Sequence, residues 1–218
     1  MTTAPASPAD DPVHALLGAL EAVGPRPALA WYGEDGRVEL SGHVLANWII
    51  KAIGHLADEI ALEPGEITVV DLAPHWKRLV VVIATFALGA DLRSVPGQDP
   101  VRVLFTSDPA SPAADEADDV LAVEAASLSP GFPGTLPPLV HDWAAEVRSS
   151  PDHLMAPLPA WSGPDVVPPA ESVVLVPDDG LDHLDTVLGV WLAGGRVVGP
   201  ASAVTEAVAR AEGVTMRL

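Results

Sequence analysis

The chain has 218 residues, enough for one large domain or two small ones, and its hydrophobic fraction of 49% can supply a buried core. Thirty acidic residues are set against eleven Lys and Arg, and the resulting net charge of −19 argues against nucleic acid and anionic membranes as partners. Cysteine is absent, which excludes disulfides, thiolate metal ligands and cysteine nucleophiles.

The start of the chain lacks the features of a signal peptide. Residues 1–11 are rich in Pro, Ala and Asp and contain neither a basic start nor an apolar stretch, so we expect a disordered tail. The longest apolar run, residues 79–90, is shorter than the roughly 20 residues that span a bilayer, and predicts a buried helix. Together these features predict an acidic, cytoplasmic protein.

Two helices and a hairpin are predicted near the start. Residues 12–23 have the apolar spacing of a short helix, and residues 28–40 contain two apolar runs separated by a Gly/Asp turn. Ser41 favours the start of a longer helix because its hydroxyl can accept a hydrogen bond from an unpaired backbone N–H. Apolar residues then recur at helical spacing as far as Ile60, with His55 on the opposite, polar side.

Two later segments match each other without a gap at an offset of 105 residues. Residues 68–95 and 173–200 each consist of an apolar run, a polar loop, an amphipathic helix, a glycine and a second apolar run. Gly89 aligns with Gly194 at the end of the two predicted helices. The match indicates a strand-helix-strand unit used twice, and predicts an α/β fold with one or more mostly parallel sheets and flanking helices.

The remaining segments complete this alternating pattern. Residues 108–119 are acidic and rich in Pro and Ala, and residues 150–170 contain six prolines, so both are predicted to be loops. We expect residues 12–218 to form a single α/β domain, with 12–105 and 140–218 as candidate subdomains joined by the acidic segment. Short strands are predicted at 101–106, 120–123 and 214–218, and short helices at 140–149 and 205–211.

The order of several motifs resembles a known family. The motifs are Val38–Gly42, Leu62–Val70, Leu72–Arg78 and Phe86–Pro96, followed later by residues 173–198. They are similar to the opening of adenylate-forming enzymes, which include acyl-CoA synthetases, the adenylation domains of peptide synthetases and luciferases. The chain most resembles truncated actinobacterial proteins related to these AMP-binding enzymes, and the resemblance implies the fold of their N-terminal subdomains.

The chain departs from this family where nucleotide chemistry would be expected. The family's phosphate loop, a Ser/Thr/Gly-rich run ending in Pro-Lys-Gly, would lie between residues 130 and 172, and no such run occurs there. Such a loop directs backbone N–H groups and a cation at phosphate. The family's magnesium-coordinating segment and its C-terminal domain with the catalytic Lys have no counterpart in this sequence. We therefore assign no catalytic residue and no cofactor; ATP, AMP and Mg would bind only if the ancestral site survives.

The loop after the first repeated strand is the better candidate for a ligand site. Asp71, His75 and Trp76 follow the strand at residues 67–70, and ligands of open α/β sheets bind beyond the carboxyl ends of strands. His75 could act as an acid or base near neutral pH, and Trp76 could stack on a ring. In the alternative, the loop caps the following helix and Trp76 packs against a neighbouring helix.

The second repeated unit contains a matching polar loop. Asp178, Asp179 and His183 lie there, and the i, i+4 spacing of Asp179 and His183 can bind a metal on one helix face. Aspartates at a helix start also cap it and complement its dipole without any ligand, and we assign no metal site. If the two loops faced each other across one sheet, they would form a shared ligand site.

Three functions follow from these observations. The preferred one is a non-catalytic remnant of an AMP-binding domain, a pseudoenzyme that binds an acyl or adenylate-like small molecule or a protein partner. The second is a subunit-like fragment of an acid–CoA ligase or another adenylating enzyme, completed by a partner chain that supplies the phosphate loop. The third is a distinct small α/β enzyme that uses His75 and the loop at residues 178–179. The first is preferred because the opening motifs match while the phosphate loop is missing.

Overall fold

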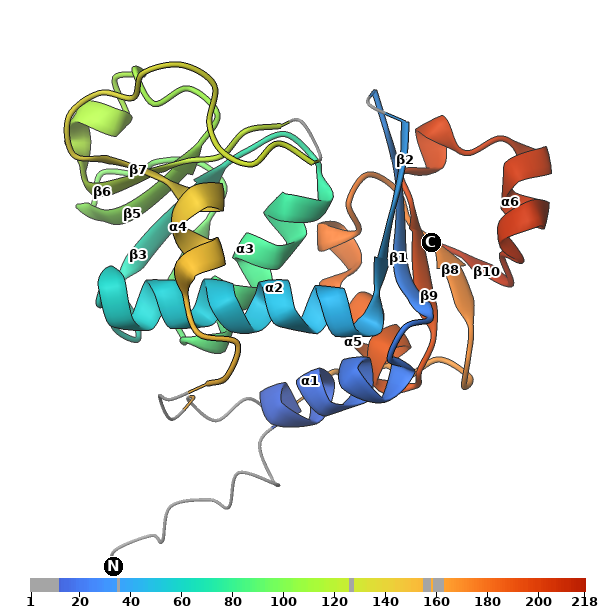
Figure 1. Cartoon of the computed structure of the whole chain (residues 1–218). Helices are drawn as coiled ribbons and strands as arrows, with labels where there is room; N and C mark the ends of the chain where they lie inside the picture. Colours follow the sequence, from blue (N-terminus) through green and yellow to red (C-terminus); the bar gives the residue numbers. More distant parts are fainter. Residues whose placement is uncertain (1–11, 35, 126–127, 155–157, 159–162) are drawn as a thin grey trace, which may run out of the picture. The chain divides into compact units, whose positions relative to one another are not determined.

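A computed structural model describes residues 12–34, 36–125, 128–154, 158 and 163–218 (Figure 1). The predicted α/β class is confirmed, since the described strands form two five-stranded sheets in which most neighbouring strands are parallel. The chain divides into two compact units: unit 1 combines Met1–Ala46 with Ala160–Leu218, and unit 2 is Asn47–Pro159. The boundary falls inside a helix, and the acidic segment belongs to unit 2.

Unit 1 is built on a sheet with the strand order β10-β8-β9-β1-β2. The predicted hairpin is its antiparallel edge, while β9 pairs with β1 in parallel. Its elements are α1 (Pro12–Val23), β1 (Pro27–Gly33), β2 (Gly36–Ser41), the first residues of α2 (Gly42–Gly54), β8 (Val173–Leu175), the 3-10 turn η4 (Leu181–His183), α5 (Leu184–Leu192), β9 (Arg196–Gly199), the 3-10 turn η5 (Ala201–Ala203), α6 (Glu206–Glu212) and β10 (Met216–Arg217).

Unit 2 is built on a fully parallel sheet with the order β4-β3-β5-β6-β7. Its central helix α3 is buried on nearly all sides, as the long apolar run predicted. Its elements are the rest of α2, the π-helix η2 (His55–Glu59), β3 (Ile67–Asp71), α3 (Trp76–Ala87), β4 (Asp91–Arg93), β5 (Val101–Thr106), the 3-10 turn η3 (Ala114–Glu116), β6 (Ala117–Ala122), β7 (Val140–Asp142) and α4 (Trp143–Ser149).

The two repeated segments adopt the same strand-helix-strand structure, as predicted. β3 and β4 pair in parallel through α3, and β8 and β9 pair in parallel through α5. Each helix ends at a glycine in the left-handed conformation, with φ of 72° at Gly89 and 71° at Gly194. A side chain is strained at such an angle, so glycine is the residue that ends both helices at least cost.

The helix α2 begins where the sequence predicted. The Ser41 hydroxyl accepts a hydrogen bond from the backbone N–H of Val44 at 3.2 Å, which caps the first turn. The helical path continues past Gly54 as a π-helix, a rare form that is frequent at functional sites. His55, which we expected on the polar side, is only 1% exposed. Apolar spacing along α2 could not reveal this burial, because the polar partner of His55 comes from α4.

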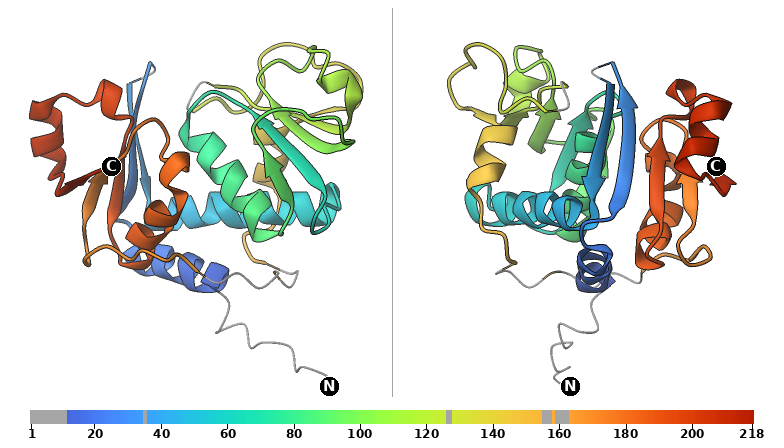
Figure 2. Two further views of the ribbon diagram at one scale, coloured as in Figure 1. Left: turned by 180° about the vertical axis from the view of Figure 1, so that it is seen from behind. Right: turned by 45° about the vertical axis from the view of Figure 1, so that its right-hand side comes forward.

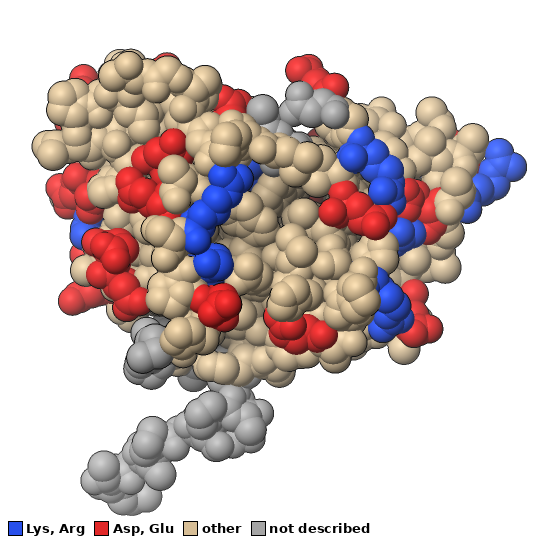
Figure 3. All heavy atoms as spheres, viewed as in Figure 1, with Lys and Arg blue, Asp and Glu red and all other residues tan. Residues whose placement is uncertain are grey.

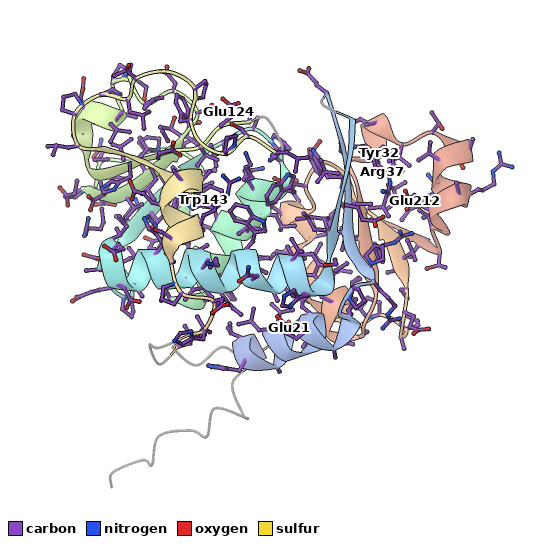
Figure 4. All side chains as sticks on the ribbon, in the orientation of Figure 1. Glu21, Tyr32, Arg37, Glu124, Trp143 and Glu212 are labelled. Atoms are coloured by element: carbon purple, nitrogen blue, oxygen red, sulfur yellow. The ribbon has the colours of Figure 1, made fainter. Side chains whose placement is uncertain are left out.

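In unit 1 an ionic cluster joins the hairpin to α6 (Figure 4). Glu212 pairs with Arg37 at 2.8 Å and with Arg196 at 2.9 Å, and accepts a hydrogen bond from the Tyr32 hydroxyl. Burial of the Glu212 carboxyl raises its pKa, but hydrogen bonds from Arg37 and Tyr32 lower it further, so the pKa lies below its ordinary value. Burial and the contact with Glu212 raise the pKa of Tyr32. On the same side of the sheet, α6 packs on an apolar cluster that includes Ala30, Leu175 and Val198 (Figure 2).

Close packing between α1 and the start of α2 gives a test of unit 1. A Cβ added at Gly42 would lie 2.2 Å from the carbonyl oxygen of Leu20 and 2.7 Å from Cβ of Val23. We therefore expect Gly42→Ala to lower the free energy of unfolding by about 2 kcal/mol or more, because the backbone must shift. The matched control is Gly18→Ala, where a Cβ meets nothing within 4 Å and should raise helix stability slightly. Equal denaturation midpoints for the two variants would contradict the packing.

Candidate functional site

A pocket of about 370 Å³, a volume that includes the space at its mouth, opens at the carboxyl edge of the unit 2 sheet. Three neighbouring strands, β3, β5 and β6, end at this edge, so the pocket has the position expected for a ligand site in a parallel sheet. It is lined by Leu72, Ala73, Pro74, His75, Lys77, Arg78, Ser107, Val123, Glu124 and Ala125.

The lining contains a buried cation. Lys77 lies in the first turn of α3, is 1% exposed, and donates a hydrogen bond from Nζ to the backbone oxygen of Glu124 at 2.8 Å. Its Nζ also lies 5.8 Å from the centre of the Trp76 ring, within cation–π range. Glu124 lies on the loop after β6, at the end of the sheet where α3 begins (Figure 4). Lysine is almost never fully buried, because an ammonium is costly to remove from water unless its hydrogen bonds are replaced.

The residues predicted after β3 divide between two roles. His75 lines the pocket, and its Nδ1 accepts a hydrogen bond from the backbone N–H of Lys77 at 3.1 Å, which caps α3. Trp76 points away into the core at 1% exposure and meets the ring of Trp48 edge-on at 5.5 Å. Asp71 is exposed at the last position of β3. His75 therefore caps α3 through Nδ1 and Trp76 packs against Trp48, as in the alternative interpretation, while His75 also lines the pocket.

The second predicted loop lies in unit 1, so the two loops follow strands of different sheets. Asp179 is buried, and its Oδ1 accepts a hydrogen bond from the backbone N–H of Leu181 at 3.3 Å. Asp178 is exposed with φ of 43°, and His183 is exposed at the start of α5. The condition for a shared ligand site, two loops at one sheet, is therefore not met, because β3 and β8 belong to separate sheets. Within the described ranges, no group of three or more His, Asp or Glu could hold a metal ion.

A second polar cluster in unit 2 was not anticipated. Oε2 of Glu146 lies 3.0 Å from Nε2 of His55 and 2.9 Å from Nδ1 of His141. An ionised carboxylate only accepts hydrogen bonds, so both ring nitrogens donate. His141 also approaches Asp119 at 3.6 Å, and Asp119 is bonded by Arg102. The cluster links η2, α4 and three strands of the sheet, and only the tertiary structure brings its members together.

The same hydrogen bonds set the ionisation of Glu146. Burial of its carboxyl raises the pKa, the hydrogen bonds from His55 and His141 lower it, and the pKa lies below its ordinary value. The ionised form is therefore favoured in the folded state.

Comparison with known proteins agrees with this architecture. No protein-family model matches the chain. A TIGR03089 family protein of Mycobacterium tuberculosis, an actinobacterium, is 34% identical over 145 residues, which cover 61% of this chain and 56% of that protein. The chain therefore spans just over half of this relative.

Solved structures give a broader match. An acyl-CoA synthetase of Brucella canis superposes with a TM-score of 0.67 at 15% identity, covering 93% of this chain and 46% of its own. Acetoacetyl-CoA synthetase of Streptomyces lividans superposes with a TM-score of 0.70 at 14% identity, and the match covers 95% of this chain and 42% of that enzyme. The N-terminal subdomain of NpsA from Klebsiella oxytoca was solved in complex with 3-hydroxybenzoyl-AMSN. It superposes with a TM-score of 0.56 at 13% identity, and the match covers 94% of this chain and 58% of that subdomain.

This is the fold of the N-terminal domains of adenylate-forming enzymes. The predicted resemblance to that part of the family, and to an actinobacterial protein, is confirmed. The identities to the solved structures are low, so these structures establish the adenylate-forming fold alone. In the described part of the chain, no helix combines the length and apolar character needed to cross a bilayer.

The cap on α3 gives a test of the role of His75. Replacing His75 by Ala removes the acceptor for the Lys77 N–H, and we expect the free energy of unfolding to fall by about 1 kcal/mol. His75→Asn should retain most of the stability, because an asparagine oxygen can accept the same hydrogen bond. Chemical denaturation of the three proteins measures the difference. If Asn proved as destabilising as Ala, the capping role would be excluded.

The lowered pKa of Glu146 predicts a pH-dependent contribution to stability. Its ionised carboxylate contributes fully above the pKa of the unfolded chain, and the contribution is lost as the pH falls through the lower, folded-state pKa. We expect Glu146→Gln to lower the free energy of unfolding by at most about 1 kcal/mol near pH 5.5, because this carboxyl is partly exposed. The difference should shrink towards pH 3. Glu116→Gln, at an exposed position in η3, is the control, and a difference for Glu146→Gln that is independent of pH would contradict the mechanism.

Proposed function

We propose that this chain is a non-catalytic small-molecule binding module built on the adenylate-forming fold, and that its ligand binds in the unit 2 pocket. The observation that carries the proposal is the pocket itself. It lies beyond the carboxyl ends of β3, β5 and β6, and it combines an apolar lining with a few fixed polar groups.

Two observations favour binding over catalysis. The stretch between residues 130 and 172 lacks a Ser/Thr/Gly-rich run ending in Pro-Lys-Gly, so this stretch offers no loop of backbone N–H groups and lysine for the phosphates of ATP. His75, the residue of the pocket best suited to acid–base chemistry, uses Nδ1 to cap α3. Because Nδ1 accepts from the backbone, Nε2 carries the ring proton, so the imidazole in this state can donate a hydrogen bond to a ligand but cannot act as a general base.

Similarity to ligand-binding relatives supports a small molecule as the occupant. The NpsA subdomain was solved in complex with 3-hydroxybenzoyl-AMSN, and the match covers 94% of this chain. An anthranilate CoA ligase of the same fold was solved with anthranoyl-AMP. We extend from these proteins only the capacity of the fold to hold a small organic ligand.

A pocket-filling variant tests the proposal. Ala73 lies exposed in the lining, so Ala73→Trp should fill the pocket without disturbing the core. The probes are benzoate, phenyl phosphate, benzyl alcohol and AMP. We expect at least one to raise the thermal midpoint of the wild type by a few degrees at a hundredfold excess over its dissociation constant, and Ala73→Trp to abolish the shift.

The matched control is Ala110→Trp, an exposed position in the same unit that is not part of the pocket lining, and it should respond like the wild type. A shift that survives Ala73→Trp, or the absence of any shift, would overturn the pocket assignment. Release of pyrophosphate from ATP in the presence of benzoate would instead overturn the non-catalytic assignment.

A further inference from the structure

The end strands of the two sheets differ in what they expose. An end strand presents backbone N–H and C=O groups that a further strand can bind. Leu92 in the end strand β4 is 36% exposed, and among the described residues it is the only large hydrophobic residue of a strand exposed to this degree. Phe86 in the last turn of α3 and Val95 just after β4 are also exposed. The end strand β2, in contrast, keeps Val38 and Leu40 buried. β4 is therefore the edge best suited to bind another strand.

The hydrogen bonds between β4 and β3 fix the direction of the backbone groups of β4. The N–H of Asp91 donates to the carbonyl oxygen of Glu66 at 2.8 Å, and Asp91 is paired with Ile67, so Asp91 faces β3. Parallel pairing uses alternate residues of a strand, so Arg93 also faces β3, and the N–H and C=O of Leu92 point away from it. In the described part of the sheet no strand follows β4 on that side. The backbone of Leu92 can therefore pair with a strand from outside the sheet.

The charges of β4 are arranged so that the strand is complementary to itself. Asp91 and Arg93 flank Leu92 and share one face of the sheet, because side chains alternate along a strand. In an antiparallel pair of two β4 strands centred on Leu92, each Asp91 lies opposite the Arg93 of the other copy. The two Leu92 residues lie opposite each other and exchange two backbone hydrogen bonds. Charges on an edge strand usually keep other strands away, but this order of charges favours a second copy.

The present partners of Arg93 do not prevent this exchange. Its guanidinium pairs with Asp91 at 2.8 Å and with Asp99 at 2.9 Å, and both carboxylates are largely exposed. Exposed ion pairs contribute little to stability, so a change of partner from Asp91 of the same strand to Asp91 of a second copy costs little.

The charge of the whole chain limits where two copies can meet. The net charge is −19, and acidic side chains are spread over the visible face of the molecule (Figure 3). Two copies therefore repel each other at long range, and a contact between them must bring opposite charges together locally. An antiparallel β4 pair does this twice, once on each side of its two-fold axis.

We propose that the chain forms a symmetric dimer in which the β4 strands of two copies pair antiparallel about Leu92 and join the two unit 2 sheets. Both copies use the same surface, as in most dimers with two-fold symmetry. The contact is small, and small interfaces are typical of weak, reversible complexes, so the dimer should form as the protein concentration rises. Its residues do not line the unit 2 pocket, so this inference goes beyond the proposed function and does not depend on it.

Charge reversal tests the contact and its register. Asp91→Arg places arginines opposite each other in a homodimer, and Arg93→Asp places aspartates opposite each other, so each variant alone should associate at least tenfold more weakly than the wild type. A mixture of the two variants should form a dimer again, because every cross-strand pair then has opposite charges. Sedimentation equilibrium up to about 1 mM protein measures the dissociation constants.

A matched control separates local pairing from net charge. Asp152→Arg, at an exposed position after α4, changes the net charge by the same amount as Asp91→Arg and should associate at least as tightly as the wild type. Backbone amide signals of the ¹⁵N-labelled wild type locate the contact without any variant. The Leu92 N–H should shift and exchange more slowly as the concentration rises, while the Asp91 N–H, already bonded to Glu66, should change little.

Four outcomes would overturn the proposed dimer. A wild type that stays monomeric up to about 1 mM would do so, and would leave this edge to a strand of a different protein. Association that is unchanged in both charge-reversal variants, or that leaves the Leu92 N–H signal unchanged, would place the contact elsewhere. A mixture of the two variants that associates no more than either alone would exclude the antiparallel register about Leu92.

Discussion

Parallel strands cannot be joined by a tight turn, and this constraint determines the structure of both units. The chain must cross back over the sheet before it can add the next parallel strand, and a helix is the usual path. The unit built from β3, α3 and β4 and the one built from β8, α5 and β9 are two uses of this solution. A further consequence is that several strands end at one edge. Loops from β3, β5 and β6 therefore meet in space although they are distant in the sequence, and the pocket of unit 2 is formed by these loops.

The same geometry places the first turn of α3 beside the pocket. Lys77 follows directly from a helix start that His75 caps, so the position of its ammonium depends on the backbone of that turn. Removing a lysine from water is unfavourable, and the hydrogen bond to the Glu124 backbone oxygen offsets part of that cost. The start of α3 thus has two roles: it ends the loop after β3, and it places His75 and Lys77 in the lining of the pocket.

Much of the architecture could be predicted from the sequence because it depends on local patterns. Apolar spacing located α1, the hairpin and α3, and the serine before α2 identified a cap that the structure contains. The loop after β3 was predicted as a ligand site because ligands of parallel sheets bind at that edge, and its residues Leu72 to His75 line the pocket. Burial of Lys77 and His55 could not be predicted in this way. Each depends on a partner that lies far along the chain, a carbonyl after β6 for Lys77 and a carboxylate on α4 for His55, and no periodicity within one helix encodes such a partner.

The placement of the two polar loops at different sheets could not be predicted for a related reason. A repeated segment establishes that two pieces fold alike, but not that they join one sheet. Each copy of the unit found its own neighbours, β5 beside β3 in one case and β10 beside β8 in the other. Similarity between two segments of a chain therefore predicts that they have the same local structure, but it does not predict which strands become their neighbours in a sheet.

The glycines that end α3 and α5 show how one backbone angle can recur in segments of different sequence. The two segments share few residues, yet their φ angles at Gly89 and Gly194 differ by only a degree. Nearly every side chain differs between the two segments while this backbone angle is the same, since any residue with a side chain would be strained there. The common angle reflects the shared geometry of leaving a helix for a parallel strand, so the same glycine is expected wherever a crossover unit is closed in this way.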